Sequence, residues 1–201
     1  IHARQDAFLY SGFEQLITPD EYIETVKNNT FTDTLKKQGV KQGDVFFLPA
    51  GRVHAIGAGC FIAEIQQTSD ITYRIYDFDR RDAEGKPREL HTELAKGAID
   101  FKLYNTYRTH YEKSRNLPVK LAACPYFTTH LLEIDQPMKR NFATLDSFVI
   151  YICVAGSCTL QDNRGNEVAL RQGETLLLPA DTASVTLVPG EVTRLLETYI
   201  D

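Results

Sequence analysis

The 201-residue sequence has no apolar run near the roughly 18 residues that a membrane-spanning helix needs, which excludes a helical membrane protein. It also has no excess of basic residues. The net charge is −5 and the pI is near 5.6, so the chain carries no electrostatic footprint for nucleic acid. It opens without a methionine, a basic n-region or a cleavable apolar segment. The missing basic footprint and the missing membrane span make a small molecule the expected partner, and cysteines in apolar stretches without C-x-x-C spacing favour the cytoplasm.

Motifs for nucleophilic catalysis and for cysteine-bound metals are also missing. There is no G-x-S-x-G, and no cysteine has a histidine beside it in a suitable context, so serine and cysteine nucleophiles have no support. The four cysteines lack C-x-x-C spacing and lie in apolar, strand-like stretches such as IYICVAGSCTL. We expect all four to be buried thiols.

Apolar residues make up 43% of the chain, enough for a sizeable core in one large or two small domains. Spacing of apolar residues predicts helices near 19–38 and 89–101. Residues 43–78 contain short β-branched and aromatic runs separated by glycine or Ser-Asp breaks, which predicts strands. Residues 103–118 form a polar, tyrosine-rich connector, and short strands are predicted again after Val119. We therefore predict two domains, residues 1–110 and 111–201.

An internal repeat links the two predicted domains. The segment VKQGDVFFLPA, which contains Gly43, aligns with LRQGETLLLPA, which contains Gly173, 130 positions later. Both copies have the spacing G-x5-P-x-[G/D]-x2, followed by His54 in the first copy and Ser184 in the second. We expect each glycine to open a turn, the strand to cross a barrel wall and the proline to end the pairing. The next side chain would then point into the barrel, so the second barrel has lost a ligand.

The first copy, with His54-Ala55 and the string EIQQTSDITYRIYD at 64–77, resembles the type I mannose-6-phosphate isomerases in their short bacterial form, a family of cupins. The resemblance extends to the Arg-Glu-Leu-His segment at 88–91 and to the second repeat. It implies a mainly β fold: a jelly-roll-like antiparallel barrel with a short helical insert, followed by a second, degenerate cupin barrel. The implied reaction interconverts mannose 6-phosphate and fructose 6-phosphate through a zinc-assisted cis-enediol proton transfer, which makes a sugar phosphate the expected partner.

The resemblance implies a Zn²⁺ cofactor for which this chain supplies one ligand, His54. The family's other ligands, a Gln/His-x-His pair and a glutamate, are expected upstream of this chain, and His2 is a poor replacement for them. Residues 1–7 are similar to the stretch just after the family's glutamate. We therefore expect roughly the first third of the natural protein to be absent and the fragment to be inactive alone.

Arg74 is the candidate for binding substrate and stabilising charge. Strand alternation would place it on an inward face, where a guanidinium needs an anion, and the family's arginine at this place is catalytic. The alternative is an exposed arginine paired with Asp70 or Asp77. Glu64 is a candidate catalytic base and Gln66 a candidate substrate ligand, both expected to face the same cavity, although either could instead satisfy Arg74 or a tyrosine.

Two other functional classes stay open. A metal-dependent cupin oxygenase would need at least two histidines and a carboxylate at iron, and only one motif histidine is visible. A non-catalytic sugar-binding or structural cupin draws support from Ser184 and from the missing ligands. His91, His110 and His130 are predicted to have structural roles only, and the sequence carries no signal of oligomeric state.

Overall fold

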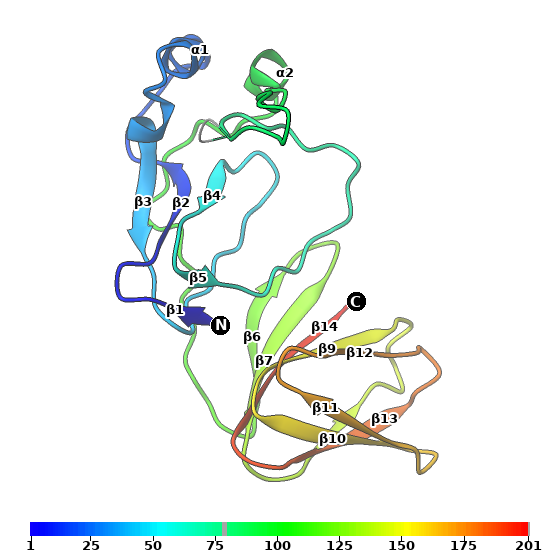
Figure 1. Cartoon of the computed structure of the whole chain (residues 1–201). Coiled ribbons are helices and arrows are strands. Elements are labelled where there is room, and N and C mark those ends of the chain that lie inside the picture. The colour runs from blue at the N-terminus through cyan, green and yellow to red at the C-terminus, as the bar shows by residue number, and fades with distance from the viewer. Residues whose placement is uncertain (78–79, 201) are drawn as a thin grey trace. The chain divides into compact units, whose positions relative to one another are not determined.

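The computed structural model describes residues 1–77 and 80–200, which form two compact units (Figure 1). The C-terminal unit contains residues 110–201 together with Ile1 and residues 63–67, and the N-terminal unit contains residues 2–62 and 68–109. Across the described residues the elements are mostly strands, β1 to β14, with two α-helices and one 3-10 turn. The predicted mainly β fold class is confirmed.

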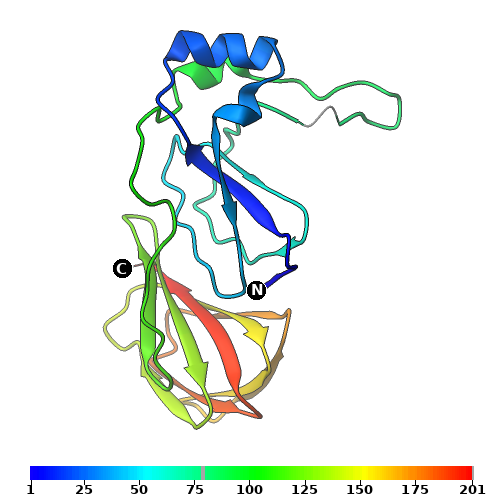
Figure 2. The same ribbon diagram turned by 90° about the vertical axis from the view of Figure 1, so that its left-hand side faces the viewer.

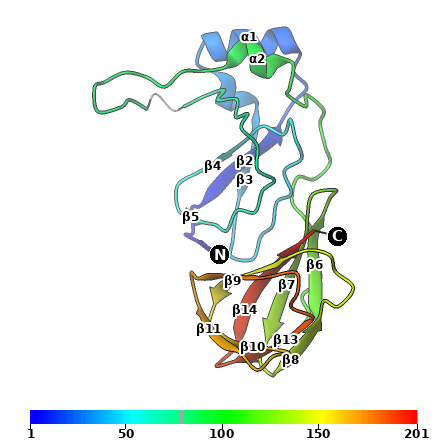
Figure 3. The same cartoon turned by 90° about the vertical axis from the view of Figure 1, so that its right-hand side faces the viewer.

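The C-terminal unit consists of two antiparallel sheets with strand orders β12-β9-β14-β7-β6 and β11-β10-β13-β8 (Figure 3). The strands are β6 (Pro118–Ala123), β7 (Thr128–Ile134), β8 (Met138–Asn141), β9 (Val149–Ala155), β10 (Ser157–Asp162), β11 (Glu167–Arg171), β12 (Thr175–Leu178), β13 (Ser184–Pro189) and β14 (Thr193–Tyr199). Every pairing inside these sheets is antiparallel. The predicted barrel is thus present as two open sheets with a shared core, which is the jelly-roll form of a cupin.

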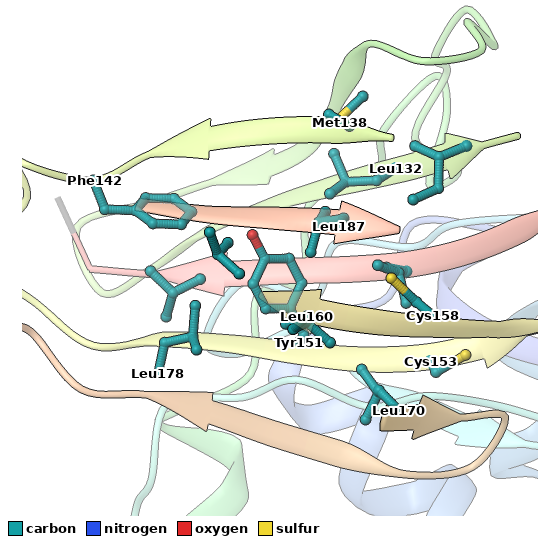
Figure 4. Packing of buried hydrophobic residues seen from close by; sticks show 14 residues of the cluster. Leu132, Met138, Phe142, Tyr151, Cys153, Cys158, Leu160, Leu170, Leu178 and Leu187 are labelled. Atoms are coloured by element: carbon teal, nitrogen blue, oxygen red, sulfur yellow. The ribbon is translucent and has the colours of Figure 1, made fainter. Parts of the chain in front are cut away.

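Alternating burial along the strands builds the core of this unit. In β9 the alternate residues Val149, Tyr151 and Cys153 are buried, and β10 buries Cys158 and Leu160 in the same way. Side chains from both sheets meet in one cluster (Figure 4), whose buried members are Leu132, Ile134, Met138, Phe142, Val149, Tyr151, Cys153, Cys158, Leu160, Leu170, Leu178, Val185, Leu187 and Leu195. The period of two that the sequence displays therefore corresponds to one inward face on each strand.

A carboxylate lies inside this core. Glu197 of β14 is 0% exposed, and its two oxygens accept hydrogen bonds from Arg140 Nε at 2.8 Å and Nη2 at 2.7 Å. The Tyr151 hydroxyl donates to the same carboxylate at 2.6 Å. Burial first, and then the charge of Glu197, raises the pKa of Tyr151 well above its usual value. Arg140 of β8 thereby bridges the two sheets through a fully hydrogen-bonded ion pair.

The N-terminal unit packs helices against a small sheet. Its elements are β1 (His2–Ala3), β2 (Phe8–Phe13), α1 (Pro19–Lys27), η1 (Phe31–Thr34), β3 (Leu35–Gly39), β4 (His54–Ile56), β5 (Cys60–Phe61) and α2 (Thr92–Lys96). The sheet order is β3-β2-β4, and β1 pairs with β5. The two helices lie side by side (Figure 2). No helix in the described parts of the chain is long and apolar enough to cross a membrane.

Helix α1 begins as its sequence predicts. The Thr18 hydroxyl accepts a hydrogen bond from Glu21 N, the Glu21 carboxylate accepts one from Thr18 N, and Pro19 occupies the first turn. Its buried face contributes Tyr22 to a core that also contains Phe13 and Phe31. The helical insert predicted before Gly43 is confirmed for this segment.

Several predicted elements are shorter than expected or of another kind. Residues 35–38 were expected in a helix, but they belong to strand β3, which pairs with β2. The helix expected at 89–101 reduces to the five residues of α2, which ends at Gly97. Within 43–77 only β4 and β5 are strands, and Val45 makes an isolated bridge to Thr109. A strand needs a paired neighbour, and the remaining apolar runs have none within the described chain. Phe78 lies outside the described residues.

The repeat is visible in the backbone. Gly43 and Gly173 both adopt left-handed φ angles, 91° and 88°, as the predicted turns require. His54 is the first residue of β4, and its counterpart Ser184 is the first residue of β13. The alignment of the two copies is therefore confirmed at the turn and at the strand that follows the proline.

The four free cysteines differ in how deeply they are buried. Cys153 and Cys158 are buried, and burial raises the pKa of Cys153 and raises that of Cys158 to about 11. Cys60 and Cys124 are only partly buried, so the prediction was wrong for these two. Cys60 is the first residue of the two-residue strand β5, and the second residue, Phe61, is exposed. This apolar stretch is therefore covered on one side only.

Candidate functional site

His54 lies after a tight turn in which the carbonyls of residues 51–53 all take part in hydrogen bonds. Gly51, with φ of 83°, accepts from Asp100 N at 2.9 Å, and Val53 accepts from Gly12 N at 2.8 Å. The carbonyl between them, that of Arg52, is 3.0 Å from Nδ1 of His54. The folded turn therefore presents this oxygen to the imidazole in a fixed direction.

This contact decides which ring nitrogen of His54 is available. A carbonyl oxygen only accepts, so Nδ1 carries the proton and donates it, and Nε2 keeps its lone pair. The residue is exposed, and no other described residue bonds to its ring. A histidine whose Nδ1 is bonded to a backbone carbonyl and whose Nε2 is open has the arrangement typical of a metal ligand.

Aromatic contacts hold the turn that carries His54. The buried guanidinium of Arg52 lies over the rings of Tyr104 and Tyr107, at 4.4 and 4.7 Å from their centroids. The Tyr107 hydroxyl donates to the carbonyl of Phe13 at 3.0 Å. Gly12 permits this approach, because a Cβ at that position would lie 2.2 Å from the Tyr107 ring.

Arg74 is partly buried, and its contacts differ from those predicted. Its backbone N–H donates to Nδ1 of His91 at 3.0 Å, and its carbonyl accepts from His91 N at 2.8 Å. Its Nη1 donates to the carbonyl of Glu89 at 3.2 Å. The expected strand at 72–77 is absent because the backbone groups of Arg74 bond to this loop instead of to a neighbouring strand.

Asp77, one of the two predicted alternatives as a partner for Arg74, is engaged elsewhere. Arg88 donates to both of its carboxylate oxygens, one of them from Nε at 2.6 Å. The hydrogen bonds of Arg88 hold the pKa of Asp77 below its usual value, and the charges of Arg74 and Arg80 lower it further. Because the folded-state pKa is lowered, this pair stabilises the fold above the ordinary carboxyl pKa and stops doing so as the pH falls through the lowered value.

Glu64 and Gln66 are placed differently from the prediction. Both are exposed and lie beyond the end of β5, outside any strand. Both group with the C-terminal unit, whereas His54 and Arg74 belong to the N-terminal unit. Their assignment as base and substrate ligand stays a prediction.

The described residues supply one of the donors that a catalytic zinc ion requires. Across the described residues, no three or more side chains of His, Cys, Asp or Glu are grouped as a metal site. A catalytic zinc ion normally takes three protein ligands. The residues present therefore fit one ligand position, at Nε2 of His54, and do not form a complete site.

Residues 119–195 match the family model described as mannose-6-phosphate isomerase, cupin domain. The mannose-6-phosphate isomerase ManA of Bacillus subtilis is 38% identical over 130 residues, which are 64% of this chain and 41% of that protein. A mannose-6-phosphate isomerase of Streptococcus mutans is 32% identical over 180 residues, 89% of this chain and 56% of that protein. The crystal structure of a mannose 6-phosphate isomerase from Bacillus subtilis covers 100% of this chain at a TM-score of 0.85 and 26% identity.

The chain is similar in sequence and in fold to the cupin-type mannose-6-phosphate isomerases. The resemblance identified from the sequence is confirmed, and with it the cupin fold. The chain spans about half the length of the curated mannose-6-phosphate isomerases that it matches.

Two residues close to the candidate residues were not predicted to take part in the site. His91 was predicted to be structural, but it bonds to both backbone groups of Arg74. Arg52 was not considered, although its carbonyl determines which nitrogen of His54 is free. His91 is part of the Arg-Glu-Leu-His segment included in the family resemblance, and Arg52 lies inside the repeat motif. The sequence therefore pointed to both positions without indicating what either residue does.

Proposed function

We propose that this chain acts within a longer enzyme that interconverts mannose 6-phosphate and fructose 6-phosphate. The observation that carries the proposal is the match over the whole chain to a crystal structure of a mannose 6-phosphate isomerase. The open Nε2 of His54 supports it further, because this is the donor that a metal-assisted isomerase would need at this position.

Aldose–ketose isomerisation moves the proton on C2 to C1 through a cis-enediol, after the sugar ring has opened. Zinc, when bound, supplies a Lewis acid at the sugar oxygens. In this proposal His54 is one zinc ligand, and Arg74 stabilises negative charge on the oxygens of the enediol-like transition state. Arg74 suits this role because its guanidinium bonds to the neutral carbonyl of Glu89, while the carboxylate of Asp77 bonds to Arg88. Glu64 is the candidate base and Gln66 a candidate contact to the substrate.

The first test compares zinc content and mannose 6-phosphate isomerase activity in this chain and in the complete gene product. We expect zinc and activity in the complete protein and neither in the 201-residue chain, because the chain offers one donor where a catalytic zinc ion needs three. Zinc and activity absent from both would refute the isomerase and leave a non-catalytic cupin, the class that Ser184 favours.

Replacing Arg74 by alanine in the complete gene product tests the charge-stabilising role. We expect kcat to fall by about 10²- to 10³-fold, the usual cost of removing one donor to a developing oxyanion. Steady-state kinetics measure the change, with Arg164→Ala as the control, because Arg164 is an exposed arginine that bonds only within the C-terminal unit. An Arg74→Ala enzyme with kcat close to the wild-type value would remove Arg74 from the reaction.

A further inference from the structure

Two hydrogen bonds join Arg74 and His91. The Arg74 N–H donates to Nδ1 of His91 at 3.0 Å, and the His91 N–H donates to the Arg74 carbonyl at 2.8 Å. Because a backbone N–H can only donate, Nδ1 of His91 must be the unprotonated nitrogen and Nε2 must carry the proton. This is the opposite tautomer from that of His54, and it is required by the position of the Arg74 backbone.

The same short segment also holds the charged end of Arg74. Nη1 donates at 3.2 Å to the carbonyl of Glu89, two residues before His91. The backbone of Arg74 and one nitrogen of its guanidinium are therefore both bonded to residues 89–91. Since the acceptor is a neutral carbonyl, the side chain keeps its full charge while its direction is restricted.

His91 is itself firmly anchored. It precedes α2, and its carbonyl accepts from Ala95 N at 2.8 Å. Ala95 is 0% exposed and belongs to the core of the N-terminal unit. The hydroxyl of the fully buried Tyr22 donates to the carbonyl of Thr92 at 3.2 Å. The imidazole thus connects Arg74 to a helix that is fixed to the core.

We infer that His91 is a positioning residue for Arg74: its Nδ1 fixes the backbone of residue 74 so that the guanidinium points toward the reacting oxygens. The inference rests on the proposed isomerase function, and it assigns to His91 a role that acts only through Arg74. A misplacement of about 1 Å in a catalytic group can cost about 10²-fold in rate, so the loss of this contact is expected to appear in kcat.

The test uses three variants of the complete gene product. Asparagine at residue 91 places an acceptor oxygen close to the position of Nδ1, whereas glutamine places it one bond further out and leucine has none. We expect His91→Leu and His91→Gln to lower kcat by about 10- to 100-fold with a smaller change in KM, and His91→Asn to stay within a few-fold of wild type. Thermal unfolding of each variant shows that the protein is folded.

A double-mutant cycle separates positioning from a merely structural role. If His91 acts through Arg74, His91→Leu should cause no further loss of kcat in an Arg74→Ala background. The inference would be overturned if the fold-losses in kcat of His91→Leu and Arg74→Ala multiply in the double variant. It would also be overturned if His91→Asn and His91→Leu lose equal activity, or if His91→Leu keeps the wild-type kcat. Each of these results would leave the proposed function intact. A wild-type protein without isomerase activity would instead overturn the proposed function, and the role of His91 with it.

Discussion

The complete gene product carrying His54→Ala is expected to lose its zinc, and its isomerase turnover with it. Removing a residue that only supports a metal ligand already costs about 10- to 100-fold in metal affinity, so removing the ligand itself should cost more than this. Nε2 of His54 is the donor concerned, since Nδ1 is bonded to the Arg52 carbonyl. Competition with a chromophoric chelator measures the affinity directly, and metal analysis of the purified protein measures the content.

The control for His54→Ala is His110→Ala. His110 is likewise an exposed histidine of this chain, predicted to have no ligand role, so its removal should leave the zinc content unchanged. A His54→Ala protein that retains one zinc per chain would contradict the assignment. Equal loss of zinc from both variants would contradict it as well, because the effect would then not be specific to residue 54.

The second large effect concerns the stability of the C-terminal unit. Arg140→Met leaves the carboxylate of Glu197 fully buried, hydrogen-bonded by the Tyr151 hydroxyl and with Nδ1 of His130 at 4.0 Å. Breaking a buried ion pair by removing one partner typically costs about 3–5 kcal/mol. Hydrogen exchange followed by mass spectrometry should therefore show protection of the β9 and β14 amides reduced by about two to four orders of magnitude in the complete gene product.

Two further variants make this prediction specific. Arg164→Met removes an exposed ion pair with Asp181 and should cost less than about 1 kcal/mol. The double variant Arg140→Met, Glu197→Leu leaves no unpaired charge and should regain most of the lost protection, because apolar replacements of a buried pair are often neutral. Equal protection in Arg140→Met and Arg164→Met would show that the buried pair does not stabilise the unit.

The C-terminal unit was the more predictable half. Its strands bury one face each, so alternation in stretches such as residues 149–155 is visible in the sequence. The repeat was equally readable, because Gly43 and Gly173 adopt the same left-handed turn. The N-terminal unit was predicted less well, since apolar runs at 43–50 and 62–67 have the composition of strands but no partner strand in the described chain. Composition predicts the tendency to pair, and pairing itself depends on a neighbour.

The sequence predicted which residues belong to the candidate site better than it predicted the hydrogen bonds that these residues make. His54 could be located because the motif fixes its distance from Gly43 and Pro49. The bond between Arg74 and His91 joins residues 17 positions apart through a loop, which produces no periodic pattern. No rule of alternation predicts that a backbone N–H will be taken up by an imidazole, so the expected strand at Arg74 was the natural reading.

The hydrogen bond between His54 and the Arg52 carbonyl has a thermodynamic consequence. It holds the ring in one orientation, so the side chain has already lost most of its rotational freedom when the chain folds. Whatever ion or molecule binds Nε2 does not have to supply that ordering free energy again, and its affinity gains by the same amount. The conformational entropy of the His54 ring is therefore lost when this turn folds, and not when the ion or molecule binds. Mutations that loosen the turn should weaken binding even though they replace no residue that contacts the bound species.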